Sequence, residues 1–316
     1  MARRGKFTWA WLIKPVTCLL AVSGGVALSL AIAQGSSTEV GETTANPVFP
    51  LNTPVAPYVT VPGSPSYATP SGVLTSWRFQ SSSDASAGSV RLKIFQHIGT
   101  GLAFKVLAES SQKTLSPSTS YEFKERIPVS SGDLLGLKAS GGAEVGITVP
   151  GTPENQLAQF SEADISVGQT GTATIAWPNL RPSVSATVEP DADHDGYGDD
   201  SQDKCPVDAT TQDFCRIDLG KLKRNKAKGT AVMPVTVPGA GTVSLSGKGV
   251  VEQPAANARR AKAATAAVKL RVKPAGKTKR KLDRSGKARV KLVVTYVPAG
   301  GPPVVASKRV KLVKQP

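Results

Sequence analysis

Short segments in which apolar and polar residues alternate, separated by glycine and proline, recur along most of this 316-residue chain. Segments 72–80 (GVLTSWRFQ) and 89–96 (SVRLKIFQ) both show this period of two. Successive side chains of a strand point to opposite faces, so each segment would gather its apolar residues on one face. The chain also has 30 Gly and 24 Pro, which supply turns. The pattern predicts an all-β fold with almost no helix.

Residues 55–188 contain seven or eight such segments at short, regular spacing. Strands of this length and spacing are typical of an antiparallel sandwich, and we expect an N-terminal jelly-roll-like β-sandwich domain here. A proline-dense stretch, residues 34–54, precedes it and is expected to be a Pro-rich leader to this domain.

The segments PYVTVPG, GVLTSWRFQ and RIPVSSGDLLGLKA resemble a β-sandwich domain found in secreted bacterial proteins. The resemblance implies a secreted bacterial multidomain protein. Some sandwiches of this kind bind sugars, but a fold alone does not establish a function. Four aromatic residues at alternating positions have two interpretations: they are buried in the core, or they form a platform on which sugar rings stack. They are Trp77, Phe79, Tyr121 and Phe123.

Residues 1–33 have the order of an export signal. Arg3, Arg4, Lys6 and Lys14 precede or open an apolar stretch that ends in Ala-Ile-Ala before Gln34. This order predicts a signal peptide cleaved near Gln34 and a secreted, extracellular or cell-envelope-associated mature protein. An uncleaved membrane anchor is the alternative, because the apolar stretch approaches the length of a spanning helix.

Cysteine usage agrees with export. Cys18 lies inside the predicted signal, so the mature chain retains only Cys205 and Cys215. In an oxidising compartment these two are expected to form a disulfide with each other. Zinc is the competing ligand, but two cysteines without a nearby histidine form a poor zinc site.

Charge divides the mature chain into two regions. Residues 34–215 contain 10 Lys/Arg and 20 Asp/Glu, a net charge of −10, whereas residues 216–316 contain 25 Lys/Arg and 3 Asp/Glu, a net charge of +22. Such an asymmetry predicts two domains with different surroundings. Six aspartates from Asp191 to Asp203 mark the junction.

The acidic junction predicts a calcium site. Asp191, Asp193 and Asp195 stand at alternate positions and Gly196 follows, which is the opening of an EF-hand-like loop. The backbone carbonyl of Tyr197 and the carboxylate of Asp199 fall at the seventh and ninth loop positions, where further ligands are expected. The competing interpretation is a solvated acidic linker.

The loop departs from the EF-hand at its twelfth position, which is Gln202 instead of a bidentate Glu. The run Asp191–Pro206 is instead similar to the thrombospondin type 3 repeat. That resemblance implies an irregular calcium-binding segment, residues 189–215, closed by a disulfide at Cys205. It leaves open whether Asp200 or Asp203 supplies the last carboxylate. We expect calcium and the disulfide to order this segment.

Residues 216–316 alternate apolar residues with Lys and Arg, as in VKLRV (268–272) and ARVKLVV (288–294). The pattern predicts strands with an apolar inner face and a basic outer face. It resembles a small immunoglobulin-like β-sandwich of secreted bacterial surface proteins. The polar segments 221–229 and 277–287 are expected to be solvated loops.

These features favour a non-enzymatic, calcium-binding structural or adhesion protein. The sequence has no G-x-S-x-G elbow or phosphate-binding glycine loop. Basic residues without interleaved aromatics argue against a specific nucleic-acid partner and favour anionic cell-wall polymers or glycans, with a merely solvated basic face as the alternative. The alternative function is a secreted carbohydrate-active enzyme or its carbohydrate-binding accessory protein.

Overall fold

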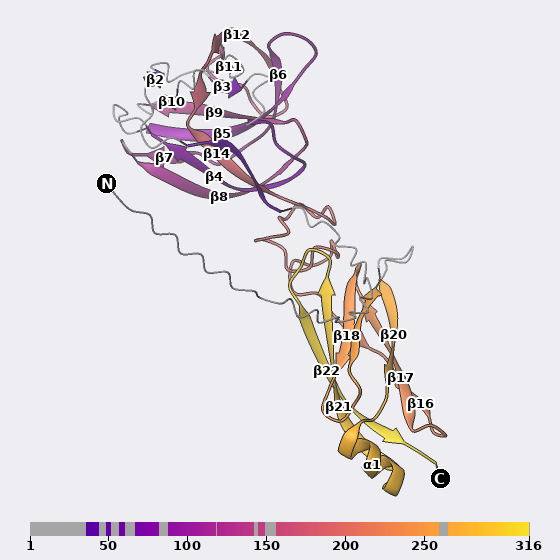
Figure 1. The fold of residues 1–316 in the computed structure, drawn as a ribbon. Helices are drawn as coiled ribbons and strands as arrows, with labels where there is room; N and C mark the ends of the chain where they lie inside the picture. The colour runs from indigo at the N-terminus through magenta and orange to yellow at the C-terminus, as the bar shows by residue number, and fades with distance from the viewer. Residues whose placement is uncertain are drawn as a thin grey trace, which may run out of the picture. The chain divides into compact units, whose positions relative to one another are not determined.

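The structure is a computed structural model, which describes residues 36–315 except residues 44–48, 52–56, 61–66, 82–87, 118, 142–144, 149–155 and 259–264 (Figure 1). The predicted signal peptide, residues 1–33, lies outside the described residues. The described chain is nearly all β, as the alternation predicts, with strands grouped before and after an irregular segment at residues 190–217.

Within the described residues, fourteen strands precede the irregular segment. They are β1 (Thr38–Glu42), β2 (Phe49–Leu51), β3 (Pro57–Thr60), β4 (Gly72–Gln80), β5 (Gly88–His97), β6 (Ala103–Glu109), β7 (Lys113–Leu115), β8 (Ser120–Val129), β9 (Leu134–Gly141), β10 (Val145–Thr148), β11 (Gln156–Phe160), β12 (Thr170–Pro178), β13 (Arg181–Pro182) and β14 (Val184–Glu189).

These strands form an antiparallel sandwich. One sheet has the order β1-β14-β4-β8, a larger one has the order β6-β12-β11-β3-β9-β5-β7, and a short sheet has the order β13-β10-β2. Trp77 and Phe79 of β4 and Leu92 and Ile94 of β5 belong to one buried apolar cluster, so the core lies between the two main sheets. The predicted sandwich is confirmed, and its period-two pattern is what buries one face of each sheet.

The larger sheet also closes on itself. β6 pairs with both β12 and β5, which joins six strands into a ring. All six contribute to a second apolar cluster, in which the rings of Phe95, Phe104 and Phe160 contact one another. Ile94 belongs to the first cluster and its neighbour Phe95 to the second, because consecutive side chains point to opposite faces. This closure was not predicted.

Lys93 is fully buried beside the second cluster. Its Nζ donates to Glu109 Oε2 at 2.7 Å and to the carbonyl of Ile165 at 2.8 Å, and lies 3.0 Å from Asp164 Oδ1. A buried ammonium is tolerated only with such partners. Lys93 therefore ties the segment around Ile165 to the sheet.

The predicted leader, residues 34–54, instead contributes two strands. β1 pairs along its whole length with β14, and β2 pairs with β10. Val40 of β1 is buried in the first core. Pro50 of β2 interrupts the alternation but is tolerated because β2 is an edge strand, whereas β1 has no proline and shows only one strongly apolar residue, Val40.

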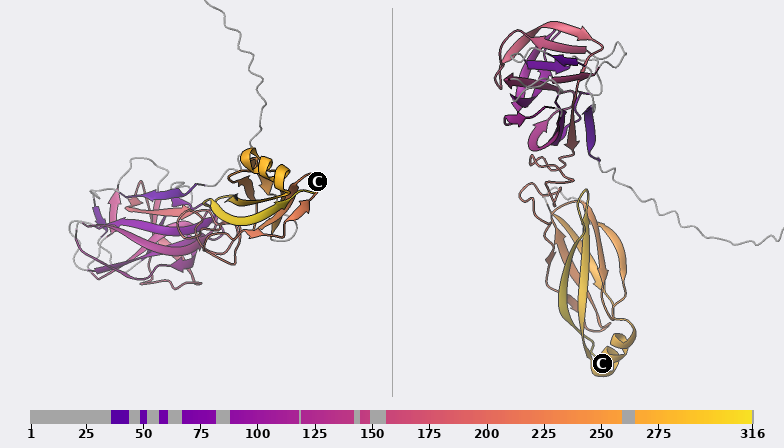
Figure 2. Two further views of the ribbon diagram at one scale, coloured as in Figure 1. Left: turned by 90° about the horizontal axis from the view of Figure 1, so that it is seen from below. Right: turned by 90° about the vertical axis from the view of Figure 1, so that its left-hand side faces the viewer.

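A second group of strands and a helix follow the irregular segment (Figure 2). In the described part of this region there are eight strands and one helix. They are β15 (Asp218–Leu219), β16 (Lys223–Asn225), β17 (Thr230–Val237), β18 (Gly241–Ser246), β19 (Gln253–Ala258), β20 (Ala266–Val272), α1 (Gly276–Ser285), β21 (Lys287–Pro298) and β22 (Val304–Val313). In one sheet β17 pairs with β15, β16 and β20, and the other has the order β19-β18-β21-β22.

The two sheets enclose one apolar core, so the second body is also an antiparallel sandwich. In β21 the apolar Val290, Leu292 and Val294 are buried while Lys287 and Arg289 are exposed. The sequence predicted this arrangement of an apolar inner face and a basic outer face.

Helix α1 corrects the expectation of a solvated loop at 277–287. Its only buried side chain is Leu282, and Gly286 ends it in the left-handed region with φ 67°, donating its N–H to the Leu282 carbonyl. A glycine accepts this conformation without strain, and the cap satisfies a carbonyl at the helix end. In the part of the chain that the structure describes, no helix has the length and apolar character to cross a membrane.

Candidate metal centre

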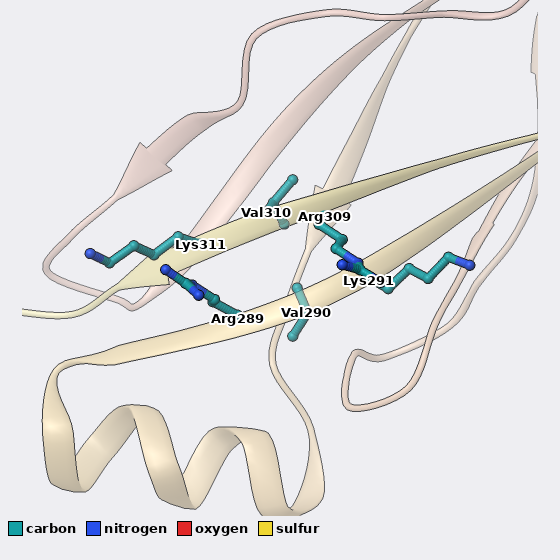
Figure 3. A pocket seen from close by; sticks show the side chains of 6 residues that line it. All are labelled: Arg289, Val290, Lys291, Arg309, Val310 and Lys311. Carbon is teal, nitrogen blue, oxygen red and sulfur yellow. The ribbon is translucent and has the colours of Figure 1, made fainter.

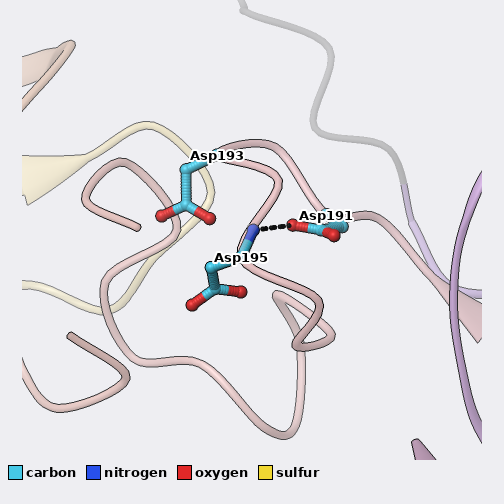
Figure 4. Close-up of side chains that lie close together, drawn as sticks. All are labelled: Asp191, Asp193 and Asp195. Carbon is cyan, nitrogen blue, oxygen red and sulfur yellow. Dashed lines mark hydrogen bonds between the residues drawn. The ribbon is translucent and has the colours of Figure 1, made fainter. Parts of the chain in front are cut away.

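The aspartate run lies in residues 190–217, which contain neither helix nor strand and connect β14 to β15. Here the side chains of Asp191, Asp193 and Asp195 come together: one carboxylate oxygen of each lies within 4.8 Å of the others (Figure 4). Two oxygens on opposite sides of an ion with bonds of about 2.4 Å would be about 4.8 Å apart. The cluster is thus of a size that could hold a metal ion.

Local hydrogen bonds fold the run into this shape. Asp191 Oδ1 accepts from the Asp195 N–H and Asp191 Oδ2 from the Gly196 N–H, each at 3.1 Å. Asp195 Oδ1 accepts from the Tyr197 N–H at 2.8 Å. Gly196 has φ 82°, a value that glycine adopts without strain. The glycine of the predicted loop therefore provides the turn for which the motif requires it.

Carboxylate oxygens without partners point to a ligand. Both oxygens of Asp193 and Oδ2 of Asp203 have almost no accessible surface, and they have no hydrogen-bond partner among the described residues. The Asp208 N–H lies near Asp193 but outside hydrogen-bond geometry. Asp203 is only 3% exposed, and its other oxygen, Oδ1, accepts from the Cys205 N–H at 2.7 Å. Buried acceptors of this kind are rare in folded proteins unless a water or an ion satisfies them.

Burial raises the pKa values of several aspartates of the run, and the crowding of negative charge adds to the rise. Burial raises the pKa of Asp193 to about 6, and the carboxylates of Asp195 and Asp203 add to the rise. Burial raises the pKa of Asp199 to about 7; the Ala192 N–H opposes the rise, and nearby aspartates reinforce it. The pKa of Asp203 is also raised, first by burial. A divalent cation would relieve this repulsion.

The remaining predicted ligands lie in different surroundings. Asp199 is buried, and its two oxygens accept from the Ala192 N–H at 3.3 and 3.2 Å. Asp200 is exposed, and its Oδ2 accepts from the Ser37 N–H at 3.1 Å. The ring of Tyr197 stacks under the Arg126 guanidinium, whose carbon lies 4.1 Å from the ring centroid.

Glu189 anchors the loop, a role that the sequence did not reveal. Its Oε2 accepts from the N–H groups of Asp200 at 3.1 Å and Ser201 at 2.8 Å, and its Oε1 accepts from the hydroxyls of Thr75 at 2.8 Å and Ser201 at 2.6 Å. In the sequence, only its position at the end of an expected strand, directly before the aspartate run, could have indicated this role. Gln212 was also missed: its Nε2 donates to Asp195 Oδ2 at 2.8 Å.

Cys205 and Cys215 form the predicted disulfide, with Cα atoms 4.9 Å apart. Both cysteines are buried in the core of the second sandwich. With both thiols in this bond, a zinc site on them is excluded. The disulfide fixes the end of the aspartate run to a folded core, and a disulfide fits an extracellular location.

The sugar platform considered for the first sandwich does not form from all four aromatics. Trp77 and Phe79 are fully buried, whereas Tyr121 and Phe123 are half-buried and pack against the same core. The core interpretation of this alternating pattern is therefore right for Trp77 and Phe79.

No family model and no curated protein matches this sequence. Among solved structures, one of Bifidobacterium dentium beta-glucuronidase complexed with coumarin-3-O-glucuronide is similar, with 13% sequence identity and a TM-score of 0.19. The match covers 89% of this chain and 47% of that chain, so this chain spans about half of that protein's length. A likeness of this strength assigns no activity.

Proposed function

We propose that residues 189–215 bind calcium, and that the protein is a secreted or cell-surface structural or adhesion protein without enzymatic activity. The observation that carries the calcium site is Oδ2 of Asp203, which is buried, has no partner among the described residues and lies near the cluster of Asp191, Asp193 and Asp195. The crowded carboxylates have no Lys or Arg among residues 191–203 to neutralise them. A bound cation would supply both the missing charge and the missing partner.

Calcium fits this donor set better than other common ions. All the side-chain donors are carboxylate oxygens, which suit hard cations such as calcium and magnesium. An irregular loop with several carboxylates suits the flexible coordination of calcium, whereas magnesium requires a nearly ideal octahedron. We assign Asp191, Asp193, Asp195, Asp199, the Tyr197 carbonyl and Asp203 to the ion. Asp200 is the weaker candidate for the last carboxylate, because it is exposed and accepts from Ser37.

The surroundings of the loop support a structural role. Glu189 links it by hydrogen bonds to Thr75 of the first sandwich, and the disulfide links it to the core of the second. An ion that orders the loop would stabilise these attachments. We further propose that the basic second sandwich holds the protein to anionic envelope material by charge.

A pair of variants tests the calcium site. Asp193→Asn removes a charge from the cluster, whereas Asp213→Asn removes the same charge from an exposed position in the same segment. Equilibrium dialysis should show calcium uptake by the wild type and by Asp213→Asn, and uptake at least tenfold weaker by Asp193→Asn. Equal uptake by both variants would show that any binding reflects net charge, and it would contradict the assignment of the calcium site to this cluster.

A further inference from the structure

Four cationic side chains form a compact array on the outer face of the β21–β22 hairpin (Figure 3). Arg289 is directly opposite Lys311, and Lys291 is directly opposite Arg309. All four are exposed, and they line a shallow hollow of about 510 Å³. Side chains directly opposite one another on a strand pair have Cβ atoms about 5 Å apart, and like charges there are destabilising. The fold thus holds together charges that repel.

In the described part of the chain, no carboxylate neutralises this array. Among the described residues, none of the four forms an ion pair. The nearby carboxylate of Asp283 is already engaged by Lys279 at 2.7 Å and Lys314 at 2.6 Å. The four cationic side chains are therefore available to bind anions.

More cationic segments meet the array at the same end of the second sandwich. Arg224 Nε donates to the Lys311 carbonyl at 2.8 Å, and the Gln315 N–H donates to the Lys226 carbonyl at 3.0 Å. Residues 221–228, 276–291 and 308–314 together contain 17 Lys/Arg and one acidic residue. A surface of this extent suits a polymer with repeated charges better than a single small anion.

The amino-acid composition of this domain limits which classes of anionic polymer the array can recognise. Residues 216–316 contain one aromatic residue, Tyr296, and it is fully buried. Single-stranded nucleic acids are commonly held by stacking of bases on exposed aromatics, and the rings of acidic polysaccharides also offer faces for stacking. Neither could stack on an aromatic here. Recognition must rest on charge and on the planar guanidinium groups of Arg289 and Arg309, which can bind phosphate through two parallel hydrogen bonds.

We propose that the β21–β22 face binds a linear polyol-phosphate chain, a phosphodiester polymer without rings in its backbone. Cations two residues apart on a strand lie about 6.6 Å apart, so successive phosphates of an extended chain can meet successive side chains. The assignment deepens the proposed attachment to anionic envelope material by naming its site and its chemistry.

The test uses the full chain and a synthetic glycerol-phosphate oligomer. Arg289→Gln/Arg309→Gln removes two charges from the array, and Lys269→Gln/Arg271→Gln removes two exposed charges from β20 of the other sheet. At 0.15 M salt the first variant should bind roughly tenfold more weakly, and the slope of log K against log salt should fall by about 1.4, as for two lost phosphate contacts. The β20 variant should bind almost as the wild type does.

Three results would overturn the assignment: equal weakening by both variants, no weakening by either, or binding of poly(dT) or polygalacturonate as tight as that of the oligomer. Thermal unfolding of both variants controls for folding, since each substitution lies on an exposed side chain. Calcium uptake by the same samples tests the metal site separately, so failure of one proposal is distinguishable from failure of the other.

Discussion

Glu189 and Gly198 show how closely the loop is fitted to the first sandwich. A Cβ on Gly198 would collide with Glu189 Oε2 and would lie 2.6 Å from Thr75 Cγ2. The absence of a side chain there lets Glu189 reach the N–H groups of Asp200 and Ser201. Hydrogen bonds to a charged acceptor contribute more than neutral ones.

Gly198→Ala should therefore displace Glu189 and weaken calcium binding. We expect a loss of about 2 kcal/mol in the free energy of unfolding, measured with denaturant in the presence of calcium. Ser201→Ala, which removes only one donor to Glu189, should cost about 1 kcal/mol. Wild-type stability in Gly198→Ala would mean that the loop moves freely away from Thr75.

The sequence predicted the residues that lie next to one another along the chain and missed those brought together by folding. Asp191 accepts hydrogen bonds from Asp195 and Gly196, which lie within five residues of it, so the spacing of the run was informative. The partnership of Glu189 with Thr75 spans 114 residues. No local pattern records such a contact.

At the level of elements, strands were predicted well and the helix was not. Apolar and polar residues alternate clearly in β21 because every second residue of the strand is buried. In α1 only Leu282 is buried, so the segment has no apolar stripe of helical period. Gly286 caps the helix, and Asp283 accepts from Lys279 in the same helix and from Lys314 after β22, so we expect the stability of α1 to depend on these contacts.

Asp283→Asn should loosen α1 in a pH-dependent way. Hydrogen bonds from Lys279 and Lys314 lower the pKa of Asp283 to about 2. Because this pKa is depressed in the folded state, its stabilising contribution is full above about pH 4 and is lost as pH falls toward 2. The wild type should therefore melt above Asp283→Asn at pH 5 to 8, and the difference should shrink between pH 4 and 2. A difference that is constant over this range would contradict the assignment.

At the scale of the whole molecule, two sandwiches with separate apolar cores lie before and after the aspartate run at which the charge of the chain changes sign. The strands of the expected leader and the closed ring were not predicted, because strand pairing between distant segments leaves no trace in local alternation. The irregular segment has few apolar residues between Asp191 and Lys204. Its order is expected to depend on the ion and the disulfide.

Chelation should therefore expose this segment to protease. Lys204 and Arg216 are exposed trypsin sites in it, and Lys226 and Lys228 are exposed sites in the second sandwich that serve as internal controls. We expect a chelator to accelerate cleavage at the first pair and to leave the second pair unchanged, as mapped by mass spectrometry. Equal acceleration at both pairs would indicate general unfolding instead.

Calorimetric titration of calcium into the intact, disulfide-bonded, chelator-stripped chain tests the central claim most directly. We predict saturable uptake at millimolar or lower calcium, with a stabilisation of about 2.7 kcal/mol when calcium reaches about 100 times its dissociation constant. The absence of any uptake at millimolar calcium would contradict the account and leave residues 191–203 as an acidic linker.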